Sequence, residues 1–116
     1  MEANRCDGIY DISLLNGQAR AILIESTALV QRAMDIHSLS RIATAALGRT
    51  LTAAAMMGSM LKNDGESVSV QIKGGGPIGT VLAVAHGDLT VKGYVDNPGV
   101  MLPPSKAGKL DVGGAV

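Results

Sequence analysis

The fold is decided by residues 40–62, which run SRIATAALGRTLTAAAMMGSMLK. Alanine, leucine and methionine favour a helix, and Ser38 or Ser40 is the expected N-cap. Small and apolar residues occupy every side of this helix and leave no polar stripe, which is typical of a helix that is buried or lies in a membrane. Arg49 interrupts the run, and the uncharged stretch Thr50–Leu61 is too short to span a bilayer. We therefore expect a central helix that other elements cover on more than one side.

Arg49 is the one charge deep inside this helix. A buried guanidinium needs a carboxylate or several carbonyl oxygens around it, because an unpaired charge in the interior is very costly. We therefore expect Arg49 to pair with an aspartate or glutamate from outside the helix. The sequence does not indicate which acidic residue this is.

A hairpin is expected near the start of the chain, because Asn16-Gly17 separates two runs rich in apolar residues. Both central residues of a type I′ turn need positive φ angles, which asparagine and glycine tolerate. A two-residue loop places six apolar side chains on one face. They are Tyr10, Ile12 and Leu14 in residues 8–15, opposite Leu23, Ala21 and Ala19 in residues 18–25. Residues 27–36 then have the spacing of a short amphipathic helix, with Ser26 or Thr27 as its cap.

After the long helix the apolar period changes to two, which is typical of strands. Three strands are expected at residues 67–73, 78–85 and 89–96, joined by short turns into a meander. Pro103-Pro104 argues against a further central strand. The order is therefore two strands, a short helix, a long helix and three strands, which favours the α+β class. Two antiparallel sheets around the long helix would explain why it has no polar side facing solvent. We therefore expect a three-layer β/α/β arrangement with a buried central helix.

Composition bounds the classes of function. The chain has 116 residues, 47% of them hydrophobic and 17% charged, which excludes a disordered protein. Its net charge of zero gives no electrostatic reason to expect a nucleic acid or an anionic membrane as partner. With no Trp or Phe, the core must consist of aliphatic side chains and methionine. Cys6 is the single cysteine and cannot form an internal disulfide or a thiolate zinc site. The first residues lack an apolar targeting segment, so a cytoplasmic protein is expected.

The glycine-rich stretch Gly74–Gly79 matches the dinucleotide fingerprint GxGxxG. That mechanism needs a helix to begin at the phosphate, whereas the residues that follow favour a strand, and Pro77 removes a backbone donor. We therefore assign Gly76 and Pro77 a structural role in a turn. His37 and His86 have no neighbours at metal-ligand spacing, and no catalytic group of residues is evident.

Several ordered blocks resemble one family. The segment Ala43–Lys62 is similar to the central helix of the heat-shock protein 33 family of bacterial chaperonins. Lys73–Gly79, Gly93–Pro98 and Gly108–Val112 resemble its next blocks, in the same order, and the likeness extends over residues 7–116. The resemblance implies an ATP-independent holdase that binds unfolding proteins under oxidative stress. It also implies a β/α/β domain, dimers in the active state, and a C-terminal domain whose CxC and CxxC cysteines bind zinc when reduced.

The chain lacks those four switch cysteines, and Cys6 matches none of them. We therefore interpret residues 1–116 as the N-terminal part of the chaperone domain, without a cofactor, and expect zinc only in a C-terminal domain outside this chain. The expected partners are unfolded or partly unfolded client proteins. We also expect a homodimer or higher oligomer with an exchanged or paired strand, because unpaired strand edges invite pairing. The sequence does not identify the residues that bind clients.

Two other functions remain open. One is a small α+β enzyme that binds an anionic substrate at the glycine turn, and the other is an inert self-association module. A holdase needs exposed apolar area and flexible side chains rather than catalytic groups. Met56, Met57 and Met60 either fill the core in place of aromatic side chains or form such an adaptable surface.

Overall fold

The computed structural model describes residues 6–116, and its elements follow the predicted order up to the last strand, after which comes a short helix that was not predicted. The strands are β1 (Gly8–Leu14), β2 (Ala19–Glu25), β3 (Ser67–Lys73), β4 (Thr80–His86) and β5 (Val91–Val95). The helices are α1 (Thr27–His37), α2 (Arg41–Gly58), α3 (Val112–Ala115) and the 3-10 turn η1 (Leu15–Gly17). β1 and β2 form one antiparallel sheet, and β3, β4 and β5 form a second in that order. The α+β class with antiparallel sheets is therefore confirmed.

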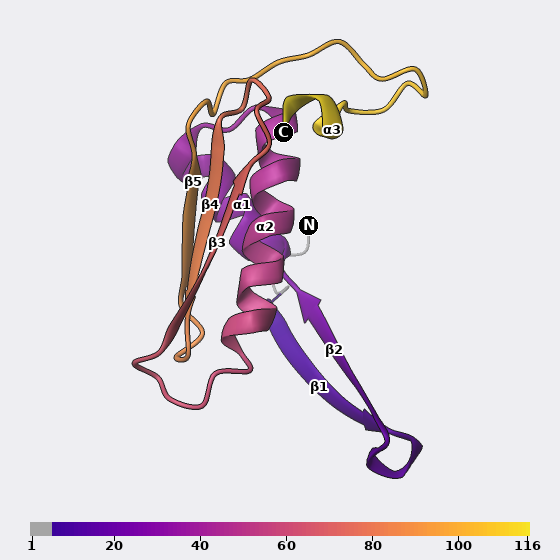
Figure 1. Ribbon diagram of the computed structural model, residues 1–116, viewed down its shortest axis with the longest axis vertical. Helices are drawn as coiled ribbons and strands as arrows, with labels where there is room; N and C mark the ends of the chain where they lie inside the picture. Colours follow the sequence, from indigo (N-terminus) through magenta and orange to yellow (C-terminus); the bar gives the residue numbers. More distant parts are fainter. Residues whose placement is uncertain (1–5) are drawn as a thin grey trace.

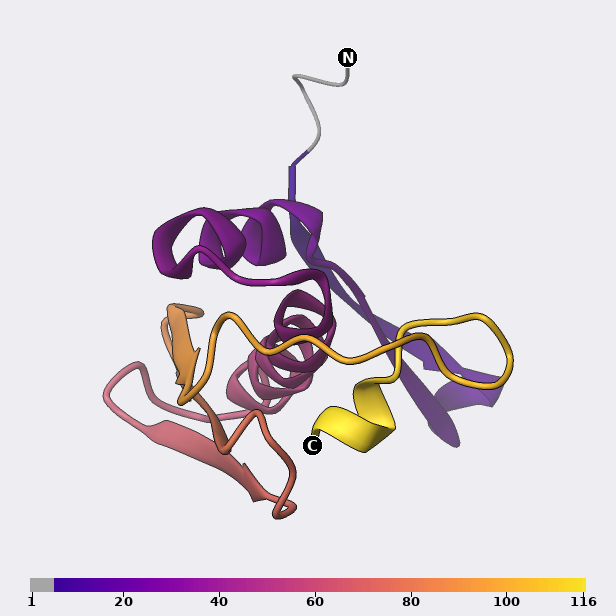
Figure 2. The ribbon, with the colours of Figure 1, turned by 90° about the horizontal axis from the view of Figure 1, so that it is seen from above.

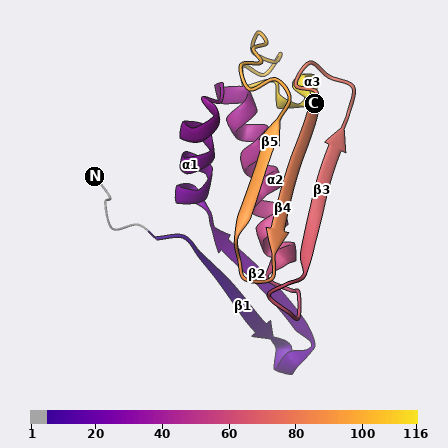
Figure 3. The ribbon, with the colours of Figure 1, turned by 90° about the vertical axis from the view of Figure 1, so that its left-hand side faces the viewer.

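The core lies between α2 and the three-stranded sheet, which runs along one side of the helix (Figure 3). On the central strand β4, Val81, Ala83 and Ala85 are fully buried, and on α2 Leu47 and Leu51 are 0% and 1% exposed. The buried hydrophobic side chains are alanine, valine, leucine and isoleucine, as the composition predicts. The sheet and the helix layer thus share one aliphatic core.

Small residues allow the sheet to approach α2 closely. A Cβ added to Gly58 of α2 would lie 2.8 Å from the Cβ of Ala85, and one added to Gly93 would lie 3.0 Å from Leu51 Cδ2. The helix begins as predicted at Ser40, whose side chain accepts a hydrogen bond of 3.1 Å from the backbone N–H of Ala43. These contacts fix α2 against the sheet along one side.

The hairpin has the predicted register, with Tyr10 paired to Leu23 and Leu14 to Ala19. Asn16 and Gly17 have φ angles of 55° and 85°, as a type I′ turn requires. β1 ends at Leu14 and β2 begins at Ala19, so each strand is one residue shorter at the turn than expected. Leu15 is also left-handed, with φ 52°, and does not continue the strand.

The hairpin projects away from the rest of the molecule (Figure 1). Tyr10, Leu14 and Leu23 on its apolar face are 59%, 46% and 57% exposed. Seen from above, α2 has the larger sheet on one side, α1 on a second and α3 on a third (Figure 2). Residues 6–116 therefore form one sheet layer and one helix layer, with a projecting hairpin. Within residues 6–116, α2 is covered on more than one side, as expected, but the hairpin does not fold over the helix as a second sheet layer, so the three-layer β/α/β arrangement is not shown.

The N-terminus of α1 is capped from a distance. Ser26 holds the N-cap position, but its hydroxyl hydrogen-bonds to Thr52 Oγ1 at 2.8 Å and makes no side-chain cap bond to α1. The carboxylate of Asp7 accepts hydrogen bonds from the backbone N–H groups of Ala28 and Leu29, at 2.9 and 2.7 Å. A negative charge there also interacts favourably with the helix dipole. The expected cap at Ser26 or Thr27 is thus replaced by Asp7, which ties the start of β1 to α1.

We predict that Asp7→Ala lowers the free energy of unfolding by about 1 kcal/mol, the usual cost of losing a helix cap. Asp7→Asn should lose less, because an amide oxygen still accepts one of the two hydrogen bonds. Urea unfolding followed by circular dichroism measures both changes. Equal stability of the Asp7→Ala variant and the parent chain would show that this contact does not hold α1.

Candidate functional site

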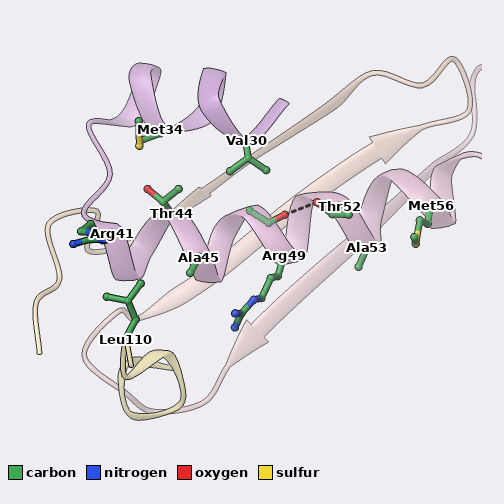
Figure 4. Close-up of a pocket in the computed structure, with 11 residues that line it drawn as sticks. Val30, Met34, Arg41, Thr44, Ala45, Arg49, Thr52, Ala53, Met56 and Leu110 are labelled. Atoms are coloured by element: carbon green, nitrogen blue, oxygen red, sulfur yellow. Dashed lines mark hydrogen bonds between the residues drawn. The ribbon is translucent and has the colours of Figure 1, made fainter. Parts of the chain in front are cut away.

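An open groove follows the side of α2 that faces away from the larger sheet, with a volume of about 660 Å³. Val30 and Met34 of α1 form one wall and Leu110 lies on the other (Figure 4). The α2 residues along it are Arg41, Thr44, Ala45, Gly48, Arg49, Thr52, Ala53 and Met56. The groove therefore uses the part of α2 that neither the sheet nor the hairpin covers.

The groove is apolar although it contains two threonines. Thr44 Oγ1 donates a hydrogen bond of 2.8 Å to the backbone carbonyl of Ser40, and Thr52 Oγ1 donates one of 2.8 Å to that of Gly48. Threonines in helices often bond back to the preceding turn in this way. Because their hydroxyls are engaged with the helix backbone, these side chains add little free polarity to the groove.

Arg41 and Arg49 are the charged side chains of the groove, and both are exposed. No acidic side chain lines the groove, and within residues 6–116 neither arginine forms an ion pair. The expected burial of Arg49 beside a carboxylate is therefore wrong for this chain. The physical reason is that Arg49 lies on the uncovered side of α2, where its long side chain reaches water.

Sequence reasoning missed Arg41 and Leu110 as groove residues. Arg41 and Arg49 are eight residues apart, which places them on the same side of a helix and could have indicated that this side faces water. Leu110 carried no such signal, because it reaches the groove from a segment remote in sequence.

Met56, Met57 and Met60 lie outside the buried core. Met56 lines the groove, while Met57 and Met60 are 39% and 51% exposed. The core-filling interpretation is therefore wrong for Met57 and Met60. Flexible, polarisable thioether side chains suit a surface that adapts to varied apolar partners.

The glycine turn is occupied by the chain's own backbone. Gly76 N–H donates to the carbonyl of Val116 at 2.9 Å, and Ile78 N–H donates to that of Ala115 at 3.0 Å. Pro77 has no N–H, and the element that follows is the strand β4 rather than a helix. Two donors that could hold a phosphate are thus engaged, and the helix that a dinucleotide site needs is missing.

The remaining candidate residues do not assemble into a site. His37 ends α1 and His86 ends β4, and Cys6 is exposed. Among residues 6–116, no three histidine, cysteine, aspartate or glutamate side chains gather closely enough to hold a metal ion. Within the same residues, no helix has both the length and the apolar character needed to cross a bilayer.

Three exposed carboxyl groups away from the groove have lowered pKa values. Hydrogen bonds from the Arg20 guanidinium lower the pKa of Asp11, on the hairpin. Hydrogen bonds from the side chain and backbone of Asn63, and from the backbone of Lys62, lower the pKa of Glu66. The side chain and backbone N–H of Thr90 lower the pKa of Asp88. These groups stabilise the hairpin and two turns in their ionised form.

We predict that acid weakens the fold through these carboxyl groups. Each has a folded pKa below its unfolded value, so its contribution is complete above the unfolded pKa and is lost as the pH falls through the folded pKa. The urea concentration at the midpoint of unfolding should therefore decrease once the pH is lowered below about 4. Asp11→Asn should reduce this dependence. An unchanged midpoint between pH 6 and pH 3 would contradict the prediction.

The chain is similar to proteins of one family in both sequence and structure. Residues 7–116 match the family described as "Hsp33 protein". The 33 kDa chaperonin of Nostoc punctiforme is 47% identical over 110 residues, which cover 95% of this chain and 36% of that protein. The 33 kDa chaperonin of Clostridioides difficile is 50% identical over 101 residues, covering 87% of this chain and 35% of that protein.

A solved structure gives the same result. The crystal structure of the 33 kDa chaperonin from Thermotoga maritima superimposes with a TM-score of 0.86 at 38% sequence identity. The match covers 93% of this chain and 37% of that one. The chain thus spans little more than a third of the length of the proteins that it matches.

Proposed function

Because the chain belongs to the Hsp33 family, we propose that it is part of an ATP-independent holdase that binds unfolding client proteins under oxidative stress. The family is one of chaperones and not of enzymes. The observation that carries the proposal is the exposed apolar face of the projecting hairpin, where Tyr10, Leu14 and Leu23 are 59%, 46% and 57% exposed. A holdase acts by covering the apolar surface of an unfolding protein, and an uncovered apolar surface of its own is the feature it needs.

The apolar side chains of the hairpin lie side by side on one face. Tyr10 and Leu23, paired across its strands, are both more than half exposed. Large exposed side chains on a projecting element are accessible to a partner of varied shape. This exposed face of the hairpin supports binding to apolar segments of partly unfolded proteins.

We place residues 1–116 in the N-terminal part of the chaperone domain of a longer, cytoplasmic protein. In this proposal the zinc-binding redox domain lies in the part of the longer relatives that this chain does not match. A further layer of that longer protein covers α2 and completes the three-layer β/α/β arrangement. The chain on its own forms a homodimer or higher oligomer, because both strands of the hairpin have an unpaired edge.

The two rival functions make different predictions. An enzyme that binds an anionic substrate at the glycine turn would need donors there, yet the N–H groups of Gly76 and Ile78 already bind carbonyl oxygens. An inert self-association module would use the same apolar surfaces, but only for contact between copies of the chain.

Light scattering of a thermally unfolding client protein tests the proposal. We expect the chain to suppress aggregation near a stoichiometric ratio without ATP. Analytical ultracentrifugation of the same sample follows self-association. Self-association without suppression would support the inert module and overturn the holdase. Titration calorimetry with a nucleoside triphosphate tests the enzyme, and we expect no binding.

A further inference from the structure

The tip of the hairpin places an asparagine side chain next to an unhindered backbone nitrogen. Asn16 and Gly17 lie in η1, at the end of the hairpin that is remote from α2 (Figure 1). Both residues are exposed, and a Cβ added to Gly17 would meet nothing within 4 Å. Because glycine has no side chain, nothing crowds its nitrogen. That nitrogen and water therefore both have access to the Asn16 side chain.

The reaction that this arrangement permits is deamidation through a cyclic imide. The backbone nitrogen of Gly17 loses its proton and bonds to Cγ of Asn16, and Nδ2 leaves as ammonia. Water then opens the imide at one of its two carbonyl carbons. Opening at Cγ leaves aspartate, whereas opening at the main-chain carbonyl carbon leaves isoaspartate, whose backbone runs through Cβ and Cγ. Either product has exchanged its amide group for an ionised carboxyl group, and water is the only co-reactant.

The backbone at Asn16 is one peptide rotation away from the reactive geometry. The five-membered imide ring holds the Gly17 nitrogen on the same side as Cβ of Asn16. This is the conformation of the first central residue of a type II′ turn, with φ about 60° and ψ about −120°. Asn16 already has φ 55°, and only its ψ, which is 40°, must change.

Gly17 permits this rotation within the hairpin. Turning the peptide group between Asn16 and Gly17 takes the φ of Gly17 from 85° to about −80°. Glycine adopts positive and negative φ angles about equally well. Type I′ and type II′ turns both match the twist of paired strands, so β1 and β2 can remain paired while the peptide group rotates.

The other asparagines within residues 6–116 are held or blocked. Asn63 Nδ2 donates a hydrogen bond of 3.1 Å to Glu66 Oε1, which must break before the side chain can turn toward the next backbone nitrogen. Asn97 precedes Pro98, whose nitrogen has no proton to lose. Within the same residues, no hydrogen bond holds the side chain of Asn16.

We propose that Asn16-Gly17 is a site of spontaneous deamidation, and that its isoaspartyl product weakens the pairing of β1 with β2. The isoaspartyl residue adds a carbon atom to the backbone of the turn. The turn then no longer matches the register that pairs Leu14 with Ala19 and aligns the apolar face of the hairpin. Any effect on client binding rests on the proposed holdase function, whereas the modification itself does not.

Peptide mapping by mass spectrometry measures the conversion of each asparagine in the 116-residue chain during incubation at about pH 8. We expect Asn16 to convert at least about fivefold faster than Asn63, whose hydrogen bond must first break. Gly17→Asn is the matched variant, because asparagine also tolerates the left-handed conformation. Its side chain crowds the attacking nitrogen, so conversion at Asn16 should slow at least about fivefold. Circular dichroism checks that the variant keeps its fold.

Hydrogen exchange of the aged chain measures the effect on the hairpin. We expect the amides of β1 and β2 next to the turn to exchange faster in the isoaspartyl form, while those of β4 do not change. Asn16→Asp carries the same negative charge on a backbone of ordinary length. It should keep the slow exchange of the parent chain, because the added backbone atom, and not the charge, disturbs the register.

Conversion of Asn16 no faster than that of Asn63 would overturn the site. So would a folded chain that stays unmodified while a sample unfolded in urea converts. Unchanged exchange in the isoaspartyl form would overturn the effect on the hairpin. The client aggregation assay is run on fresh and aged chain, and weaker suppression by the aged chain is expected. Equal suppression by both would overturn the effect on client binding, whereas suppression by neither refutes the holdase and not the modification, which the mapping measures directly.

Discussion

Leu47→Ala is expected to lower the free energy of unfolding by about 3 kcal/mol. Leu47 is 0% exposed and belongs to the core cluster that joins α2 to the sheet. Removing three carbon atoms loses their transfer energy and leaves a cavity that the neighbouring elements fill only in part. Leu51 and Val81 are also fully buried in this cluster, so the helix and the central strand would both lose packing.

Urea unfolding followed by circular dichroism measures this loss. Leu15→Ala makes the same chemical change at a side chain that is 73% exposed, and should alter stability by less than about 0.5 kcal/mol. A loss below about 1 kcal/mol for Leu47→Ala would mean that the sheet side of α2 is not the core. The groove would then lose its structural basis, because its position follows from the way α2 packs on the sheet.

Local chemistry explains why much of the fold could be predicted. The strand over residues 67–73 has the predicted bounds, because a period of two and flanking turns are visible within a few residues. The hairpin register follows from the turn at Asn16-Gly17 and from the apolar face that it aligns. These signals act between neighbours in the sequence, so a single sequence contains them.

The strand ends that differ from prediction depend on more distant contacts or on backbone angles. β4 begins at Thr80 rather than at Ile78, because Gly79 has φ 78° and the Ile78 N–H donates to Ala115. β5 begins at Val91 rather than at residue 89, because Leu89 is left-handed with φ 72°. A leucine gives no sign in the sequence that it adopts such a conformation.

The uncovered side of α2 could not be predicted for a different reason. Alanine and threonine are compatible with both a buried and a half-exposed helix surface, so Ala45, Ala53 and Thr52 do not show which side faces water. The same ambiguity led to the prediction of a buried Arg49. The cap that Asp7 provides for α1 could not be predicted either, since it joins residues about 20 positions apart. Both features follow from how elements are arranged in space, which composition does not determine.

The glycine turn carries the second large effect. Gly76→Ala should lower the free energy of unfolding by about 2 kcal/mol, because it disrupts two backbone hydrogen bonds that contribute about 1 kcal/mol each. A Cβ at Gly76 would lie 2.3 Å from the carbonyl oxygen of Ala115 and 2.7 Å from the carbonyl carbon of Val116. Backbone atoms cannot rotate away as a flexible side chain can, so the C-terminal segment must move and expose Ala115 and Ile78, which are both 0% exposed.

Gly65→Ala is the matched control, because a Cβ at Gly65 meets nothing within 4 Å and its φ angle is not positive. It should leave stability unchanged or raise it slightly, since alanine restricts the unfolded chain. Hydrogen exchange at the Ile78 amide adds a local readout, because Gly76→Ala should speed exchange there while Gly65→Ala should not. Equal stability and equal exchange in the two variants would show that residues 115 and 116 do not dock on the turn. The N–H groups of Gly76 and Ile78 would then be free to bind an anion. The glycine turn would again be a possible site for an anionic substrate, as the enzyme hypothesis requires.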